Sequence, residues 1–119
     1  MRYDEAMNIW LDDQRKSPDG WTHLHNIDEV EMVMDFAINK DDFCIEIMSF
    51  DFHLNHEKNG VDVMKYLAGL CVQHKTSKFW PKKILYHSDD PQGVVIMREF
   101  EEEYMKIRSG SFKMDIIQT

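Results

Sequence analysis

The chain has 119 residues, a formal net charge of −8, and a composition that is 43% hydrophobic and 30% charged. These values predict one globular domain spanning residues 1–119 and exclude wholesale disorder, because a chain of this length and apolar content can build a single core. The acidic balance argues against broad DNA or RNA binding, and the lack of a long apolar run or a signal-peptide pattern predicts a cytoplasmic protein without membrane contact.

The first third of the chain is expected to hold two strands and one helix. Residues 7–11 form a short apolar run that predicts a strand. A Ser-Pro-Asp-Gly loop follows, and residues 21–25 predict a second, short strand. The gap between these strands is too short for an ordinary helical crossover, so either the second strand is irregular or the link is a long loop. Apolar side chains then recur at helical spacing over residues 28–38.

The rest of the chain continues to alternate between strands and helices. In order, the patterns predict a strand at 44–50, a helix at 61–71, a strand at 83–87, a helix at 94–107 and a last strand at 112–117. Strands that alternate with helices indicate a parallel sheet with helices on its faces. We therefore expect a three-layer α/β fold with four or five strands and about three helices.

Polar side chains stand at the ends of three predicted strands. Asp12 and Asp13 follow the first strand, and Asp51 follows the third. His87 is the last residue of the fourth strand, and Ser88 follows it. In open parallel sheets, ligands bind beyond the carboxyl ends of the strands. We therefore expect these side chains to converge on one functional site.

This layout resembles that of response-regulator receiver domains. It is more similar to a divergent branch, the cyclic-phosphate-processing receiver-like domains of bacteria and their phages. The similar segments are Trp-Leu-Asp-Asp-Gln-Arg at 10–15, Pro-Asp-Gly-Trp at 18–21, Ser-Phe-Asp-Phe-His-Leu at 49–54, Asn-Gly-Val-Asp-Val at 59–63 and His-Ser-Asp-Asp-Pro at 87–91. The resemblance covers about residues 7–104 and implies a shortened receiver fold of the flavodoxin-like type.

The chain departs from ordinary receivers at positions that serve phosphotransfer. A phospho-accepting receiver carries a Lys at the end of its fifth strand, whereas Lys113 lies near the start of the expected last strand and has no Pro after it. The residues that follow Asp51 also lack the usual Pro. Asp90 stands where the divergent branch is expected to have Asn. The resemblance therefore argues against phosphotransfer signalling through Asp51.

What the divergent branch implies is a pair of imidazoles, His53 and His87, at the site. Hydrolysis of a cyclic phosphodiester needs a base for water and an acid for the departing alkoxide, and histidine serves both tasks near neutral pH. Arg15 is expected to bind the phosphoryl oxygens through its planar guanidinium, and Ser88 to donate a hydrogen bond to them. Asp51 would orient His53 or bind a cation.

Each of these residues also has a purely structural interpretation. His53 and His87 are also consistent with partly buried structural roles, and Arg15 with an ion pair to Asp19. Trp21 fits a core anchor better than a base-stacking platform. The remaining histidines are expected to be surface residues without partners: His23, His25, His56 and His74.

Three functional hypotheses remain open at this point. The first is a phosphoesterase that opens a cyclic nucleotide or an RNA 2′,3′-cyclic phosphate end without an obligatory cofactor. The second is a phosphoesterase that depends on Mg²⁺ or Mn²⁺, for which Asp12, Asp13 and Asp51 offer hard oxygen ligands and His53 an imidazole. The third is a catalytically inactive interaction module, such as a phage-encoded protein that engages a host protein.

Overall fold

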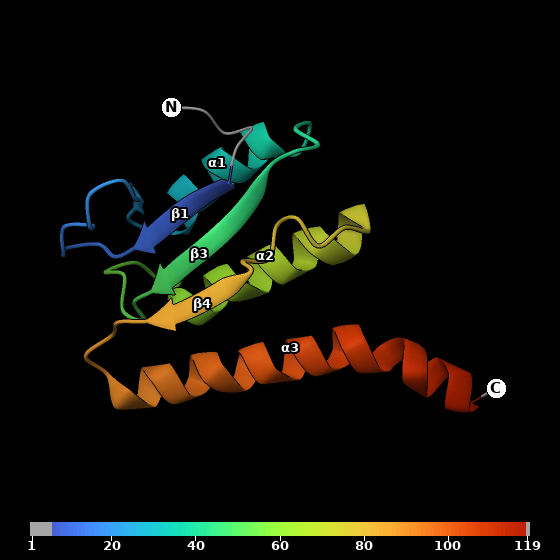
Figure 1. Ribbon diagram of the computed structural model, residues 1–119. Helices are drawn as coiled ribbons and strands as arrows, with labels where there is room; N and C mark the ends of the chain where they lie inside the picture. Colours follow the sequence, from blue (N-terminus) through green and yellow to red (C-terminus); the bar gives the residue numbers. More distant parts are fainter. Residues whose placement is uncertain (1–5, 119) are drawn as a thin grey trace.

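Four parallel strands form the sheet of this structure, a computed structural model that describes residues 6–118. The strands are β1 (Ala6–Leu11), β2 (Thr22–Leu24), β3 (Cys44–Phe50) and β4 (Lys83–Tyr86), and the helices are α1 (Ile27–Ala37), α2 (Gly60–His74) and α3 (Pro91–Gln118). The strand order is β2-β1-β3-β4. The parallel sheet and its three flanking helices confirm the predicted shortened receiver-like α/β fold (Figure 1).

A loop, not a helix, joins β1 to β2. Residues 12–21 contain no regular element, and β2 pairs in parallel with β1, with Leu11 opposite Leu24. The main-chain N–H of Asp12 donates to the carbonyl oxygen of Leu24 over 3.0 Å and continues this pairing past the end of β1. Of the two alternatives for this link, the long loop is therefore the one observed, and it carries site residues directly after β1.

The strands direct alternate side chains to opposite faces of the sheet. Ile9 and Met48 are opposite one another in the register and fully buried in the core. The next register row contains Trp10, Ser49 and Leu85, which must point to the other face because the side-chain period of a strand is two. In Figure 1, α1 and α2 lie behind the strands and α3 runs along the β4 edge. In the described part of the chain, α1 and α2 thus cover one face of the sheet, and α3 flanks its β4 edge.

Helix α2 begins at a capping box that brings the loop after β3 close to it. The Asn59 side chain accepts from the main-chain N–H of Val61 and Asp62, and the Asp62 carboxylate accepts from the N–H of Asn59 at 2.9 Å. The N–H of Gly60 donates to the carbonyl of Phe52 over 2.8 Å. These bonds anchor the end of the 51–59 loop at the carboxyl end of β3.

Helix α3 extends well beyond its predicted end. Its backbone is helical from Pro91 to Gln118, so the last strand expected at 112–117 is wrong. After its first turn, which holds Pro91 and Gly93, the helix contains no further Pro and one further Gly, Gly110. A Gly inside a helix costs only about 1 kcal/mol, so nothing in the sequence stops the helix before its last residues. Within the described residues, no helix combines the length and apolar character that crossing a membrane requires.

Candidate active site

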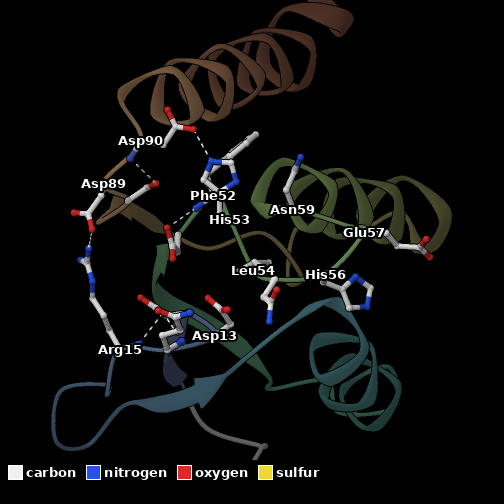
Figure 2. A pocket seen from close by; sticks show the side chains of 15 residues that line it. Asp13, Arg15, Phe52, His53, Leu54, His56, Glu57, Asn59, Asp89 and Asp90 are labelled. Carbon is white, nitrogen blue, oxygen red and sulfur yellow. Dashed lines mark hydrogen bonds and ion pairs between the residues drawn. The ribbon is translucent and has the colours of Figure 1, made fainter.

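Three loops at the carboxyl ends of β1, β3 and β4 enclose a cavity of about 860 Å³, here called the strand-end cavity. Its lining comes from residues 12–15, 51–57, 59 and 88–90. Figure 2 shows these side chains converging from separate loops. Six sequence-predicted site residues line it: Asp12, Asp13, Arg15, Asp51, His53 and Ser88. The expected convergence at the strand ends is therefore observed for these six residues.

Asp12 is the most buried carboxylate of the strand-end cavity, with a relative exposure of 1%. Its Oδ1 accepts from the main-chain N–H of Gln14 and of Arg15, both over 2.8 Å, and its Oδ2 accepts from Nε2 of His87 over 3.0 Å. Burial alone would raise the pKa of Asp12, but the two main-chain donors and His87 outweigh it and hold the pKa below its usual range. Asp12 is therefore an ionised, firmly oriented acceptor.

Asp12, Asp13 and Asp51 form an acidic cluster in which one oxygen of each lies within 4.8 Å of the others. Burial, with a further contribution from Asp12, raises the pKa of Asp51, although the Ser88 hydroxyl and the main-chain N–H of Phe52 act against the shift. The charged form of Asp51 is thus destabilised by its surroundings. Carboxylate oxygens are the ligands that Mg²⁺ and Mn²⁺ prefer, so this donor set fits such an ion.

Arg15 extends across the mouth of the strand-end cavity toward the loop after β4. Its Nη1 donates to the carbonyl oxygen of His87 over 2.9 Å, and its Nη2 forms an ion pair with Asp89. The alternative pairing with Asp19 is not the one observed. The Arg15 side chain is 45% exposed, so the guanidinium lies within reach of a ligand that enters the cavity.

His53 stands on the wall of the same cavity, on the side of α3. Its Nε2 donates to Oδ2 of Asp90 over 2.6 Å, and its side chain is 69% exposed. The hydrogen bond from His53 is the main reason why the pKa of Asp90 lies below its usual value. Asp90, which stands where the divergent branch was expected to have Asn, therefore supplies a negatively charged partner to His53.

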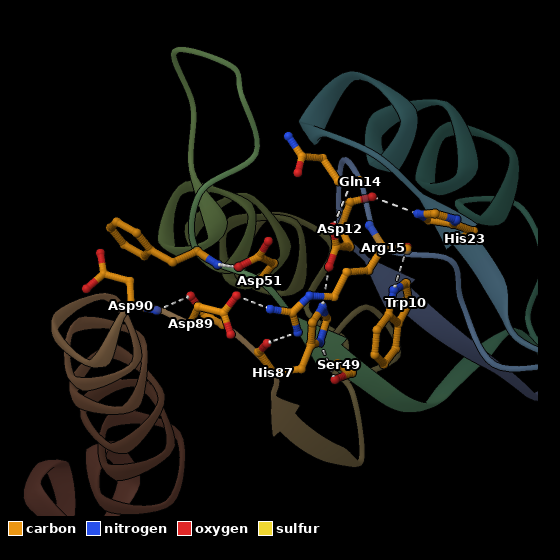
Figure 3. A network of polar contacts seen from close by, with 12 residues as sticks. Trp10, Asp12, Gln14, Arg15, His23, Ser49, Asp51, His87, Asp89 and Asp90 are labelled. Carbon is orange, nitrogen blue, oxygen red and sulfur yellow. Dashed lines mark hydrogen bonds and ion pairs between the residues drawn. The ribbon is translucent and has the colours of Figure 1, made fainter.

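His87 does not share the strand-end cavity with His53. Its ring lies on the other face of the sheet, where it lines a separate hollow of about 580 Å³ with Trp10 and Ser49. Both ring nitrogens are bound: Nδ1 lies 2.7 Å from Oγ of Ser49, and Nε2 lies 3.0 Å from Oδ2 of Asp12 (Figure 3). The structure thus connects His87 to the cavity through Asp12 and does not bring the two imidazoles together.

The prediction that four surface histidines lack partners is wrong for three of them. His23 Nε2 lies 2.7 Å from the carbonyl oxygen of Asp12, and His25 Nδ1 lies 2.9 Å from the Glu29 carboxylate. His56 lines the strand-end cavity and pairs with Asp28 at 3.2 Å. Their partners come from other loops or from the first turn of α1, which residue type and chain position do not reveal.

Sequence reasoning also missed Trp10, Ser49 and Asp89 as parts of the network in Figure 3. Trp10 and Ser49 occur inside apolar strand segments, where either side of the sheet is an equally plausible destination. The signal that links them is the pairing register of β1 with β3, which aligns these two residues. Asp89 is the ion-pair partner of Arg15 but lies far from it in the chain.

A comparison with known protein families identifies the family of the chain. A family model described as the cyclic-phosphate processing receiver domain matches residues 7–103. No curated protein and no solved structure matches the chain significantly. Because the family model covers most of the sequence, the chain belongs to the cyclic-phosphate processing receiver family.

Proposed function

We propose that this member of the cyclic-phosphate processing receiver family hydrolyses a cyclic phosphodiester in the strand-end cavity. The observation that carries the proposal is the meeting of an imidazole, a guanidinium and three carboxylates from separate loops at one cavity. An acid, a base and a cation for the phosphoryl oxygens are the groups that such a hydrolysis needs. An RNA 2′,3′-cyclic phosphate end or a cyclic nucleotide is the substrate class.

The charge of the cavity favours this substrate over a phosphate monoester. Asp12, Asp13 and Asp51 give the floor of the cavity a negative potential. The partly exposed guanidinium of Arg15 supplies a positive charge at its mouth. A cyclic diester carries one negative charge, whereas the ring-opened monoester approaches two. Repulsion from the carboxylates therefore penalises the product more than the substrate and assists product release.

We assign the two proton transfers of the reaction to Asp51 and His53, which line the cavity. Water attacks phosphorus, and the P–O bond to one ring oxygen breaks. Asp51, whose raised pKa makes it the stronger base among the carboxylates, takes the proton of the water. The His53 imidazolium, oriented by Asp90, gives a proton to the departing oxygen. Arg15 and Ser88 bind the phosphoryl oxygens as charge develops on them.

The expected roles of the two histidines are therefore revised. His53 keeps its role as a proton donor because it lines the strand-end cavity. A direct proton exchange between His87 and the substrate is not proposed, because both of its ring nitrogens are engaged by Ser49 and Asp12.

The acidic cluster favours a second candidate function, hydrolysis of the same substrate class with a divalent cation. Asp12, Asp13 and Asp51 would hold Mg²⁺ or Mn²⁺. Such an ion would neutralise phosphoryl charge and lower the pKa of a bound water. In this case Asp51 serves as a ligand and not as the base, so removal of the metal distinguishes the two candidates.

The test is a panel of substrates in the presence of EDTA and, separately, of Mg²⁺ or Mn²⁺. The panel contains RNA with a 2′,3′-cyclic end and cyclic mono-, di- and oligonucleotides. Turnover that survives EDTA supports the first candidate, and turnover only with added metal supports the second. The absence of turnover across the whole panel under both conditions would overturn both and leave the interaction module.

The role of His53 is tested by its replacement with Ala. We expect turnover to fall by about 10²–10⁴, the usual contribution of one acid–base group. His74→Ala is the matched control, because His74 is exposed at the far end of α2. Equal turnover by the two variants would exclude His53 as the proton donor.

A further inference from the structure

A chain of polar contacts runs from the interior of β3 to the floor of the strand-end cavity. It begins at Ser49, which has a relative exposure of 2%, passes through the ring of His87 and ends at the Asp12 carboxylate. The distances are 2.7 Å from Ser49 Oγ to His87 Nδ1 and 3.0 Å from His87 Nε2 to Asp12 Oδ2. Figure 3 shows the three side chains in sequence.

The donors in this chain can be assigned from the chemistry of its two ends. Asp12 already accepts two main-chain N–H groups through Oδ1, which stabilises its ionised form, so its Oδ2 can only accept. The hydrogen between Asp12 and His87 therefore belongs to Nε2. A neutral imidazole then has a lone pair on Nδ1, and this lone pair accepts the hydroxyl hydrogen of Ser49.

The plane of the His87 ring is also fixed. The indole of Trp10 lies parallel to it at an interplanar angle of 7°, with the ring centroids 3.8 Å apart. Trp10 is itself held by a hydrogen bond of 3.1 Å from its Nε1 to the carbonyl of Arg15. Trp10 thus limits rotation of the imidazole about its Cα–Cβ and Cβ–Cγ bonds. The Asp12 carboxylate requires the Nε2–H tautomer, and the Ser49 hydroxyl stabilises it by donating to Nδ1.

We infer that Ser49, acting through His87, is a positioning residue for the Asp12 carboxylate of the strand-end cavity. By donating to Nδ1, Ser49 stabilises His87 in the Nε2–H tautomer, and that N–H holds Oδ2 and so orients the Asp12 carboxylate within the acidic cluster. The catalytic consequence rests on the proposed function, whereas the tautomer assignment does not. His87 accordingly acts through Asp12 and not on the substrate.

Substitutions at His87 separate positioning from direct proton transfer. His87→Gln places an amide N–H near the position of Nε2 and keeps a donor for Asp12, but it cannot titrate. We expect His87→Gln to retain kcat within about tenfold of wild type and His87→Ala to lose about 10–100-fold, with little change in KM in either variant. If His87→Gln loses as much kcat as His87→Ala, the imidazole itself is required and the inference is wrong.

Substitutions at Ser49 test the hydroxyl itself. Thr and Val have almost the same shape and both suit a strand, but only Thr keeps the donor. We expect Ser49→Thr to retain most of the wild-type kcat and Ser49→Val to lose about 10-fold or more, again at nearly constant KM. Equal kcat values for the two variants would overturn the role of the hydroxyl. Ser49→Ala replaces the pair if the added methyl groups prevent folding.

Nitrogen NMR of ¹⁵N-histidine-labelled protein reads the tautomer without any substrate. At about pH 8, above the ordinary imidazole pKa of about 6.5, the His87 ring should show a protonated Nε2 and an unprotonated Nδ1. The His87→Gln spectrum assigns its signals among the six histidines. Ser49→Ala should weaken this preference, visible as a shift of the Nδ1 signal, and a protonated Nδ1 in the wild type would refute the inference.

This readout also separates the two proposals. A protein that opens no cyclic phosphate but shows the Nε2–H tautomer and its dependence on Ser49 would disprove the proposed function and keep the positioning role. If the protein turns over substrate while Ser49→Ala leaves both the Nδ1 signal and kcat unchanged, the proposed function stands and the positioning role of Ser49 is disproved.

Discussion

The ring of His87 lies parallel to the indole of Trp10, with centroids 3.8 Å apart. This stacking joins His87, directly after β4, to Trp10 near the end of β1. Arg15 completes this contact. Its carbonyl accepts from Trp10 Nε1 over 3.1 Å, and its Nη1 donates to the carbonyl of His87 over 2.9 Å. The three residues form a closed set of contacts that fixes the loop after β1 against the loop after β4, on two sides of the strand-end cavity.

We expect Trp10→Leu to destabilise the protein more than Trp10→Phe. The Phe ring can still stack on His87 and loses only the hydrogen bond to the Arg15 carbonyl, which costs about 1 kcal/mol. Leu also loses the ring stacking, which adds about 0.5–1.5 kcal/mol. Urea unfolding of the three proteins measures the difference. Equal free energies of unfolding for the Leu and Phe variants would show that the stacked geometry contributes nothing.

Stability should decrease as the pH falls below about 6.5, the ordinary pKa of an imidazole. Burial lowers the pKa of His87, although Asp12 acts in the opposite direction. The unfolded chain therefore binds this proton more readily than the folded one. The stabilising contribution of the neutral ring is fully present above the unfolded pKa and is lost as the pH falls from there through the folded pKa.

The measurement is the free energy of unfolding of wild type and His87→Gln across pH 5–8. Gln does not titrate, so the wild type should lose stability relative to this variant toward the acidic end. A difference between the two proteins that stays constant over the whole range would contradict the lowered pKa.

Asp51→Asn should stabilise the protein when no divalent cation is present. Burial and the charge of Asp12 raise the pKa of Asp51, so stability is lost as the pH rises through its folded pKa and the carboxylate ionises. Asn removes the charge and keeps an oxygen for the N–H of Phe52. We expect a higher melting temperature near neutral pH in EDTA.

The same variant should lose any stabilisation by added Mn²⁺, because the acidic cluster then lacks one charged ligand. Asp19→Asn is the matched control, since it removes one exposed charge outside the cavity. A lower melting temperature for Asp51→Asn than for Asp19→Asn in EDTA would mean that the Asp51 charge stabilises the fold.

Gly60→Ala should destabilise the fold, and Gly69→Ala in the same helix should not. A Cβ at position 60 would lie 2.4 Å from the carbonyl oxygen of Asp51 and 2.8 Å from Sδ of Met97, so the backbone of the site would have to shift. Such overpacking typically costs about 1–3 kcal/mol. At position 69 nothing lies within 4 Å of the added Cβ. There the higher helix propensity of Ala increases the free energy of unfolding by as much as about 1 kcal/mol.

Chemical unfolding of both glycine variants gives the comparison, and equal shifts of the two midpoints would contradict the close approach of α2 to the β3 loop. Turnover adds a second readout. Because the shift at position 60 reaches the Asp51 backbone, we expect Gly60→Ala to reduce activity and Gly69→Ala to leave it unchanged.

Local patterns were sufficient for most of the fold. The alternation of apolar runs with amphipathic segments predicted β1, β3, β4 and α1–α3, because burial of one face imposes a period on each element regardless of its neighbours. The end of α3 was mispredicted because 112–117 is apolar and short, a pattern that a strand and a helix share. The local pattern therefore does not distinguish the two.

The sequence by itself determined that polar residues end several parallel strands and therefore gather at one edge of the sheet. Direction and order of parallel strands suffice for this, so Asp12, Asp51 and His53 were placed together correctly. Which face of the sheet receives a side chain depends on the register between strands, and a shift of one residue reverses it. Only the tertiary structure could therefore place His87 beneath the cavity, between Trp10 and Ser49, where it binds Asp12.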